Sequence, residues 1–141
     1  MTSHLTSWLQ GTNAPDWDAI SSPSHFRGGN SVQRCKRLNL ASTEHRLALL
    51  VALQPAILQG RRYANEPGKM DIWVQVRPTN GCECLPYDLQ LAILDEASET
   101  VMQAIARESK NIQFEFSGTL GEHFSIRVAF GDFSLTETFV V

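Results

Sequence analysis

The chain has 141 residues, of which 43% are hydrophobic and 19% are charged, and its formal net charge is -3. This length suits a single domain with its own core, and the composition excludes an intrinsically disordered chain. The acidic balance also gives no electrostatic reason to expect nucleic acid, because proteins that bind it carry clustered basic surface.

The sequence predicts a cytoplasmic protein. No run approaches the roughly 18 apolar residues that a membrane-spanning helix needs, so we expect no membrane association. The N-terminus lacks the basic and apolar regions of a secretory signal. Cys35, Cys82 and Cys84 form an odd and sparse set, unlike the cysteines of a disulfide-stabilised secreted domain. We therefore expect reduced thiols.

Residues 1–31 differ from the rest of the chain. They are rich in Pro, Gly, Ser, Asn and Asp and show no sustained periodicity, which predicts a tail or linker with one short helix over residues 3–11. Trp8 and Trp17 are its candidate anchors. They either pack on the chain's own domain, or dock on a partner protein.

From residue 32 to 141 the pattern is that of β-strands separated by short turns. Apolar and polar residues alternate in most of these segments, which is typical of strands with one buried face. We predict an all-β fold, an antiparallel sandwich of immunoglobulin-like type with about seven or eight strands. The last strand would leave an edge through which a homodimer could form. The predicted strands cover residues 32–40, 45–56, 70–79, 89–96, 101–109, 111–119, 123–131 and 133–141.

Two of these segments have an ambiguous pattern. Residues 47–53 form a nearly continuous apolar run that would also suit a helix. Its length and the stop at Pro55 favour a buried strand. Residues 101–109 have helix-forming composition, but their position between strands favours an antiparallel return. The basic residues 34–37 are interpreted as solvated loop or strand-edge charge, with a binding patch as the alternative.

Trp73 is predicted to lie on the face of its strand opposite Met70, Ile72 and Val74. Three interpretations follow. The N-terminal tail or the other sheet covers the indole, a partner protein binds it, or it forms a platform for stacking a sugar. The sugar interpretation requires a second exposed aromatic side chain nearby.

Cys82 and Cys84 are separated by one residue, so on a strand both thiols would lie on one face. A structural zinc ion usually needs four ligands, and the histidines are scattered singly along the sequence. The two cysteines are therefore weak metal candidates, and ordinary loop thiols are the preferred interpretation. We expect no cofactor.

Catalytic signatures are also missing from the sequence. There is no GxSxG motif and no glycine-rich phosphate loop. His123 lies close in sequence to several hydroxyl groups, but in a strand-and-turn context. Carboxylates such as Asp95 and Glu122 fall at predicted hairpin tips, where solubilising charge is the expected role and paired acid–base chemistry the alternative. We expect a protein that is not an enzyme.

The C-terminal half contains a recognisable series of motifs: LP before an alternating strand, then LDE, IQFEFSG, GE-F-S and GD-S-TE-F. In this series, and in RCKRLNL, LALLVAL and DIWVQVRPT upstream, the chain resembles the C-terminal domain of a cyanobacterial family known as domain of unknown function 1822. The likeness covers roughly residues 34–141. Its relatives would have polar or aromatic residues at positions 82 and 84, which weakens the metal interpretation.

The resemblance implies a protein without catalytic residues, often preceded in its relatives by a longer N-terminal region. Neighbouring genes for sigma factors and caspase-like CHAT-type proteins imply an adaptor in signalling or transcription control. We therefore predict a cytoplasmic protein-interaction module that works through a sheet edge or through Trp73. A carbohydrate- or small-ligand-binding sandwich is the alternative, followed by a thiol or zinc protein.

Overall fold

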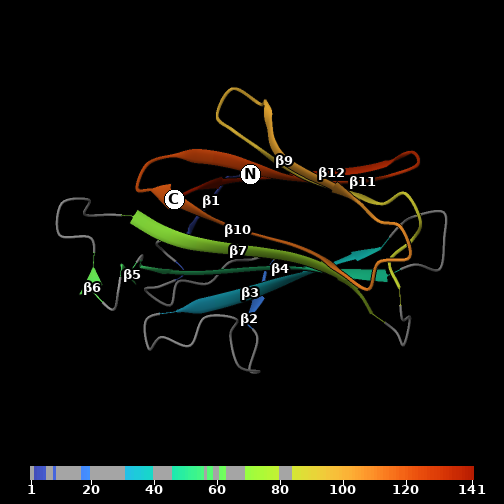
Figure 1. Cartoon of the computed structure of the whole chain (residues 1–141), viewed down its shortest axis with the longest axis horizontal. Coiled ribbons are helices and arrows are strands. Elements are labelled where there is room, and N and C mark those ends of the chain that lie inside the picture. The colour runs from blue at the N-terminus through green and yellow to red at the C-terminus, as the bar shows by residue number, and fades with distance from the viewer. Residues whose placement is uncertain are drawn as a thin grey trace.

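The computed structural model describes residues 2–5, 8, 17–19, 31–39, 46–55, 57–58, 61–62, 69–79 and 84–141. These residues form two five-stranded sheets and one two-stranded ladder. Figure 1 shows the two large sheets as stacked layers. A short helix was expected over residues 3–11. The first two of these residues belong to strand β1, Leu5 and Trp8 are helical, and the others lie outside the described residues.

The first sheet has the strand order β9-β8-β11-β12-β1. Its strands are β9 (Thr100–Ile105), β8 (Gln90–Leu94), β11 (His123–Phe130), β12 (Phe133–Val140) and β1 (Thr2–His4). All neighbours are antiparallel except β1, which pairs in parallel with β12.

The second sheet has the strand order β10-β7-β4-β3-β2, with every pair antiparallel. Its strands are β10 (Ile112–Thr119), β7 (Lys69–Pro78), β4 (Arg46–Pro55), β3 (Val32–Asn39) and β2 (Asp18–Ala19).

The predicted all-β sandwich is confirmed: each of the eight longer strands lies in a segment predicted from its sequence pattern. The two ambiguous segments are strands β4 and β9, as position and length indicated. The short ladder of β5 (Ile57–Leu58) and β6 (Arg61–Arg62) lies in a stretch expected to be loop. The immunoglobulin-like type stays a prediction, because two stacked antiparallel sheets are shared by several sandwich topologies.

The core lies between the two sheets and follows from the alternation of side chains. Met70, Ile72, Val74 and Val76 of β7 are all buried in it, as the two-residue period requires. Trp8 and Trp17 also lie in this core, and their rings approach Phe139 of β12 at centroid distances of 6.2 and 5.7 Å. Within the first 31 residues, β1 and β2 therefore pair with one sheet each, and Leu5, Trp8 and Trp17 pack inside the sandwich.

The continuous apolar run of β4 is explained by burial on both faces. Leu47, Leu49, Val51 and Leu53 contribute to the main core. The intervening residues form a second buried cluster with Trp73, which comprises Ala48, Leu50, Ala52 and Trp73. A strand buried on both faces has no polar side to reveal its period, which is why a helix was a reasonable alternative.

The basic residues 34–37 are only partly solvated, contrary to the expectation. Arg34 and Lys36 oppose Val51 and Leu49, which are buried core residues, so both cations lie on the inward face of β3. Lys36 forms an ion pair with Glu137 of β12 in the other sheet. The two side chains are only 20% and 13% exposed. This ion pair therefore links the two sheets from within.

The edge expected at the last strand is partly covered. β1 pairs with Thr138–Val140, so this half of β12 is an internal part of its sheet. The two edge strands at the opposite side of the sandwich are β9 and β10. A homodimer through the last strand stays a prediction, and among the described residues the part of β12 that β1 leaves unpaired is Phe133–Glu137.

Candidate functional site

The three tryptophans proposed as contact residues are all buried. Trp8 and Trp17 lie in the main core, and Trp73 is only 6% exposed in the second cluster. Among the alternatives for these side chains, the burial therefore favours the one in which the chain itself covers the indole rings. A ring in this state offers no face for a sugar or a partner protein to stack on.

The exposed aromatic residue in the described part of the chain is Tyr87, which is 61% exposed. Its ring is already paired, because the Arg107 guanidinium lies 4.8 Å from the ring centroid. Arg107 also forms an ion pair with Asp88. No second exposed aromatic among the described residues joins Tyr87, so the stacking surface expected of a sugar-binding site is not assembled there.

Of the two weak metal candidates, Cys82 lies outside the described residues. Cys84 is exposed, and its thiol approaches the backbone oxygen of Glu108 at 3.9 Å. The described residues contain no group of three or more His, Cys, Asp or Glu side chains arranged to hold a metal ion.

Asp95, in the hairpin between β8 and β9, and Glu122, in the connection from β10 of one sheet to β11 of the other, both help to define backbone turns. Asp95 Oδ1 accepts hydrogen bonds from the backbone N–H groups of Ala97 and Glu99, each at 2.9 Å. Glu122 Oε1 accepts one from the backbone N–H of Thr119 at 2.7 Å. Each carboxylate thereby satisfies backbone donors at a strand connection.

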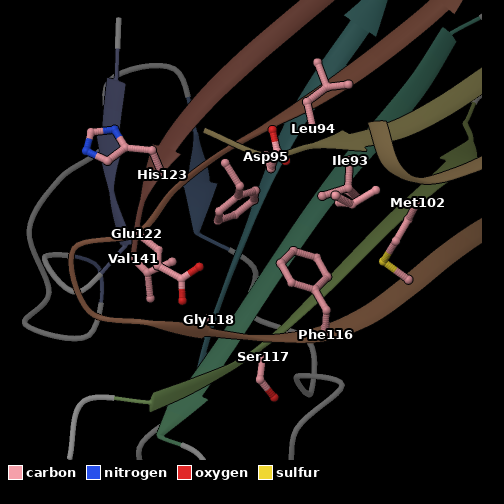
Figure 2. Close-up of a pocket in the computed structure, with 12 residues that line it drawn as sticks. Ile93, Leu94, Asp95, Met102, Phe116, Ser117, Gly118, Glu122, His123 and Val141 are labelled. Carbon is pink, nitrogen blue, oxygen red and sulfur yellow. The ribbon is translucent and has the colours of Figure 1, made fainter. Parts of the chain in front are cut away.

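Both carboxylates also line a cavity of about 310 Å³ between the two sheets, at the side where β9 and β10 are the edge strands. Its apolar surface comes from both sheets, and includes Ile93, Met102 and Phe116 (Figure 2). The ring of His123, which lies at the rim, is directed away from these apolar side chains. The full lining comprises Ile93, Leu94, Asp95, Val101, Met102, Phe116, Ser117, Gly118, Glu122, His123, Phe124 and Val141.

A β-bulge lies beside this cavity on β9. Ile93 pairs with Met102, but Leu94 pairs with Thr100, so Val101 is an extra residue without an opposite partner. A bulge bends its strand and redirects side chains. Figure 1 shows the hairpin between β8 and β9 standing away from the second sheet.

Apolar side chains remain exposed along this side of the sandwich. Val101 is 58% exposed and Ile105 is 39% exposed, and both belong to β9. Leu120 is also exposed, in the turn that joins β10 to β11. Edge strands in natural proteins are usually protected by charge or proline, but the sequence TVMQAI of β9 contains neither.

The cavity was not predicted from the sequence, which contains one signal that bears on it. An uncharged segment without proline is unusual for an edge strand, but the sequence does not reveal which strands are at the edges. The sequence pattern predicts hairpin-tip charge at Asp95 and Glu122. The prediction is confirmed for Asp95 and wrong for Glu122, because β10 and β11 belong to different sheets.

These features belong to an all-β sandwich with an open side. The chain is a member of the family described as "Protein of unknown function (DUF1822)", whose model matches residues 4–140. The match covers nearly the whole chain and begins well before the region in which the resemblance was recognised. No curated protein and no solved structure matches the chain.

Among the described residues, no helix is long and apolar enough to span a lipid bilayer.

Proposed function

We propose that the protein is a non-enzymatic interaction module that binds an extended segment of another protein along edge strand β9. The observation that carries this proposal is the combination of an edge position with exposed apolar side chains, Val101 and Ile105. Adding a strand to an exposed sheet edge is a common way for a domain to recognise a peptide, because the main-chain groups supply the hydrogen bonds.

The backbone geometry of β9 supports this mode of binding. Ala106 donates its N–H to the backbone oxygen of Leu89. In an antiparallel ladder, residues whose N–H groups face the neighbouring strand alternate with residues whose N–H groups face away from it. Because Ala106 faces β8, the N–H groups of Gln103 and Ile105 point away from β8. No described strand pairs with that side of β9. These groups are therefore available to an added strand.

The carboxylates at the cavity have a structural role in their turns. Asp95 and Glu122 each hold a turn through their hydrogen bonds to backbone N–H groups. We further propose that the module is a cytoplasmic adaptor in signalling or transcription control, with a caspase-like CHAT-type protein as candidate partner, as the resemblance implied.

Substitutions at Gln103 test the proposal. Gln103→Pro removes an N–H that points to the open edge without removing a ladder hydrogen bond. Gln103→Thr retains the N–H and is the matched control. In affinity capture from a native lysate, a partner should be retained by the wild type and Gln103→Thr and lost with Gln103→Pro. Equal recovery with all three proteins, at equal thermal stability, would contradict the proposal.

The cavity favours small-ligand binding as a second candidate function. Its volume of about 310 Å³ lies at the lower end of ligand-binding pockets. A small apolar amine such as n-octylamine should then raise the melting temperature of the wild type, and the effect should disappear with Met102→Trp, which fills the cavity. An unchanged melting temperature in the wild type would remove this candidate.

A further inference from the structure

The cavity beside β9 is suited to an apolar side chain. Ile93, Met102 and Phe116 line it, and the rings of Phe116 and Phe124 meet edge to face at a centroid distance of 5.3 Å. Apolar cavities bind water poorly. Atoms that line such a space also lack contact partners on one side. Inserting an apolar group is therefore favourable.

The charge around the cavity restricts the chemistry of its occupant. The ionisable residues in the lining are Asp95, Glu122 and His123, and the lining contains no Lys or Arg. Asp95 and Glu122 form no ion pair within the described part of the chain. Uncompensated carboxylates at the rim of a cavity attract positively charged groups.

The carboxylates are also fixed in position. Asp95 Oδ1 and Glu122 Oε1 are held by backbone N–H groups. The second oxygen of each carboxylate makes no hydrogen bond with any described residue, so it is free to accept one from a ligand. A ligand cation would therefore meet acceptors that need little reordering, which lowers the entropic cost of binding.

The strand period determines how such a ligand would be arranged. On β9, Met102 and Ala104 pack against the core, whereas Gln103 and Ile105 lie on the opposite, exposed face. Side chains of an added strand alternate in the same way. Every second residue of that strand would thus point toward the gap between the sheets, close to the cavity.

We propose that this cavity is the specificity pocket for the added strand, and that it selects an extended segment in which a large apolar residue has Lys or Arg two positions away, on the same face of the strand. The apolar side chain enters the cavity, and the cations meet Asp95 and Glu122. This inference rests on the function proposed above, since it needs a strand paired with β9.

Selection from a displayed library of random nonapeptides on the purified wild-type protein tests both ideas. We expect enriched peptides to share an apolar residue with Lys or Arg two positions away, and to show no enrichment on the Gln103→Pro protein. No enrichment on the wild type, or equal enrichment on Gln103→Pro, would overturn the proposed function. Enrichment of acidic or unpatterned peptides that Gln103→Pro abolishes would overturn only the pocket.

The consensus peptide, synthesised with a fluorescent label, then tests the pocket directly by anisotropy. Glu122→Gln keeps the oxygen that caps the Thr119 N–H but removes the charge, and should weaken binding at least threefold. Met102→Trp fills the cavity and should weaken binding at least tenfold. Unchanged affinity in both variants, at unchanged melting temperature, would overturn the pocket.

Analytical ultracentrifugation of the unliganded protein tests whether a second copy of this chain binds the β9 edge instead. A mass that rises with protein concentration for the wild type but not for Gln103→Pro would assign the edge to a second copy of this chain. That result would overturn the assignment of the pocket to a basic segment of another protein. A monomeric wild type supports the assignment.

Discussion

Gly118 of β10 offers a direct test of the packing at the closed end of the cavity. A Cβ built on Gly118 would lie 2.9 Å from Val141 Cγ2 and 3.3 Å from Ile72 Cδ1. Val141 has little freedom to retreat, because its N–H donates to Glu122 O and its O accepts from Gly121 N. Its side chain is branched at Cβ and buried.

Overpacking of this kind typically costs about 1–3 kcal/mol. Replacing glycine also reduces the entropy of the unfolded chain, which offsets about 0.4–1 kcal/mol. We therefore expect Gly118→Ala to lower the free energy of unfolding by about 1–2 kcal/mol. Urea unfolding at equilibrium measures this, and an unchanged slope with denaturant would confirm that the two states remain comparable.

A double-mutant cycle distinguishes the steric cause from other effects. Val141→Ala removes the atom that opposes the new Cβ, so the double variant should be about 1 kcal/mol more stable than the sum of the single effects predicts. Gly121→Ala is the matched control, because it has φ +90° but no heavy atom within 4 Å. It should destabilise through backbone strain and show no coupling to the Gly118 substitution. A Gly118→Ala protein as stable as the wild type, or additive with Val141→Ala, would refute the reasoning.

Three further predictions concern stability and are measured by the same unfolding assay. Glu137→Ala leaves Lys36 without its partner between the sheets and should lower the free energy of unfolding by about 1–3 kcal/mol. The double variant Lys36→Met with Glu137→Leu should be nearly as stable as the wild type. A Glu137→Ala protein as stable as the wild type would contradict the buried ion pair. Ser98 has φ 63° in the β8–β9 turn, so Ser98→Val should cost about 1–2 kcal/mol and Ser98→Gly much less; equal stability would exclude backbone strain. Trp73→Ala should cost about 3–5 kcal/mol because the indole is buried, and a loss below about 1 kcal/mol would show that this face is exposed in solution.

Much of the fold was predictable because its signals are local. Alternating side chains define β7, β10 and β11 in the sequence, and glycine-containing turns such as the one at Gly131 (φ 55°) separate the strands. The positions of the strands follow from this two-residue period. The two faces of β7 follow from it as well, and they place Trp73 opposite the main core.

The candidate site was not predictable, because it depends on which strands meet in space. Asp95 belongs to the β8–β9 hairpin and Glu122 to the connection between β10 and β11, and only the stacking of the two sheets brings them to one cavity. In the same way, the bulge at Val101 is a property of the pairing between β8 and β9. Neither feature changes the local pattern of hydrophobic residues.

By itself, the sequence determined that the chain forms about eight strands, where they lie, and to which family it belongs. Only the tertiary structure decided that the three tryptophans are buried, that Lys36 faces Glu137 between the sheets, and that uncharged β9 is an edge. The physical reason is that a strand's period is encoded in consecutive residues. Burial, ion pairing and edge position instead depend on neighbours that are distant in the sequence.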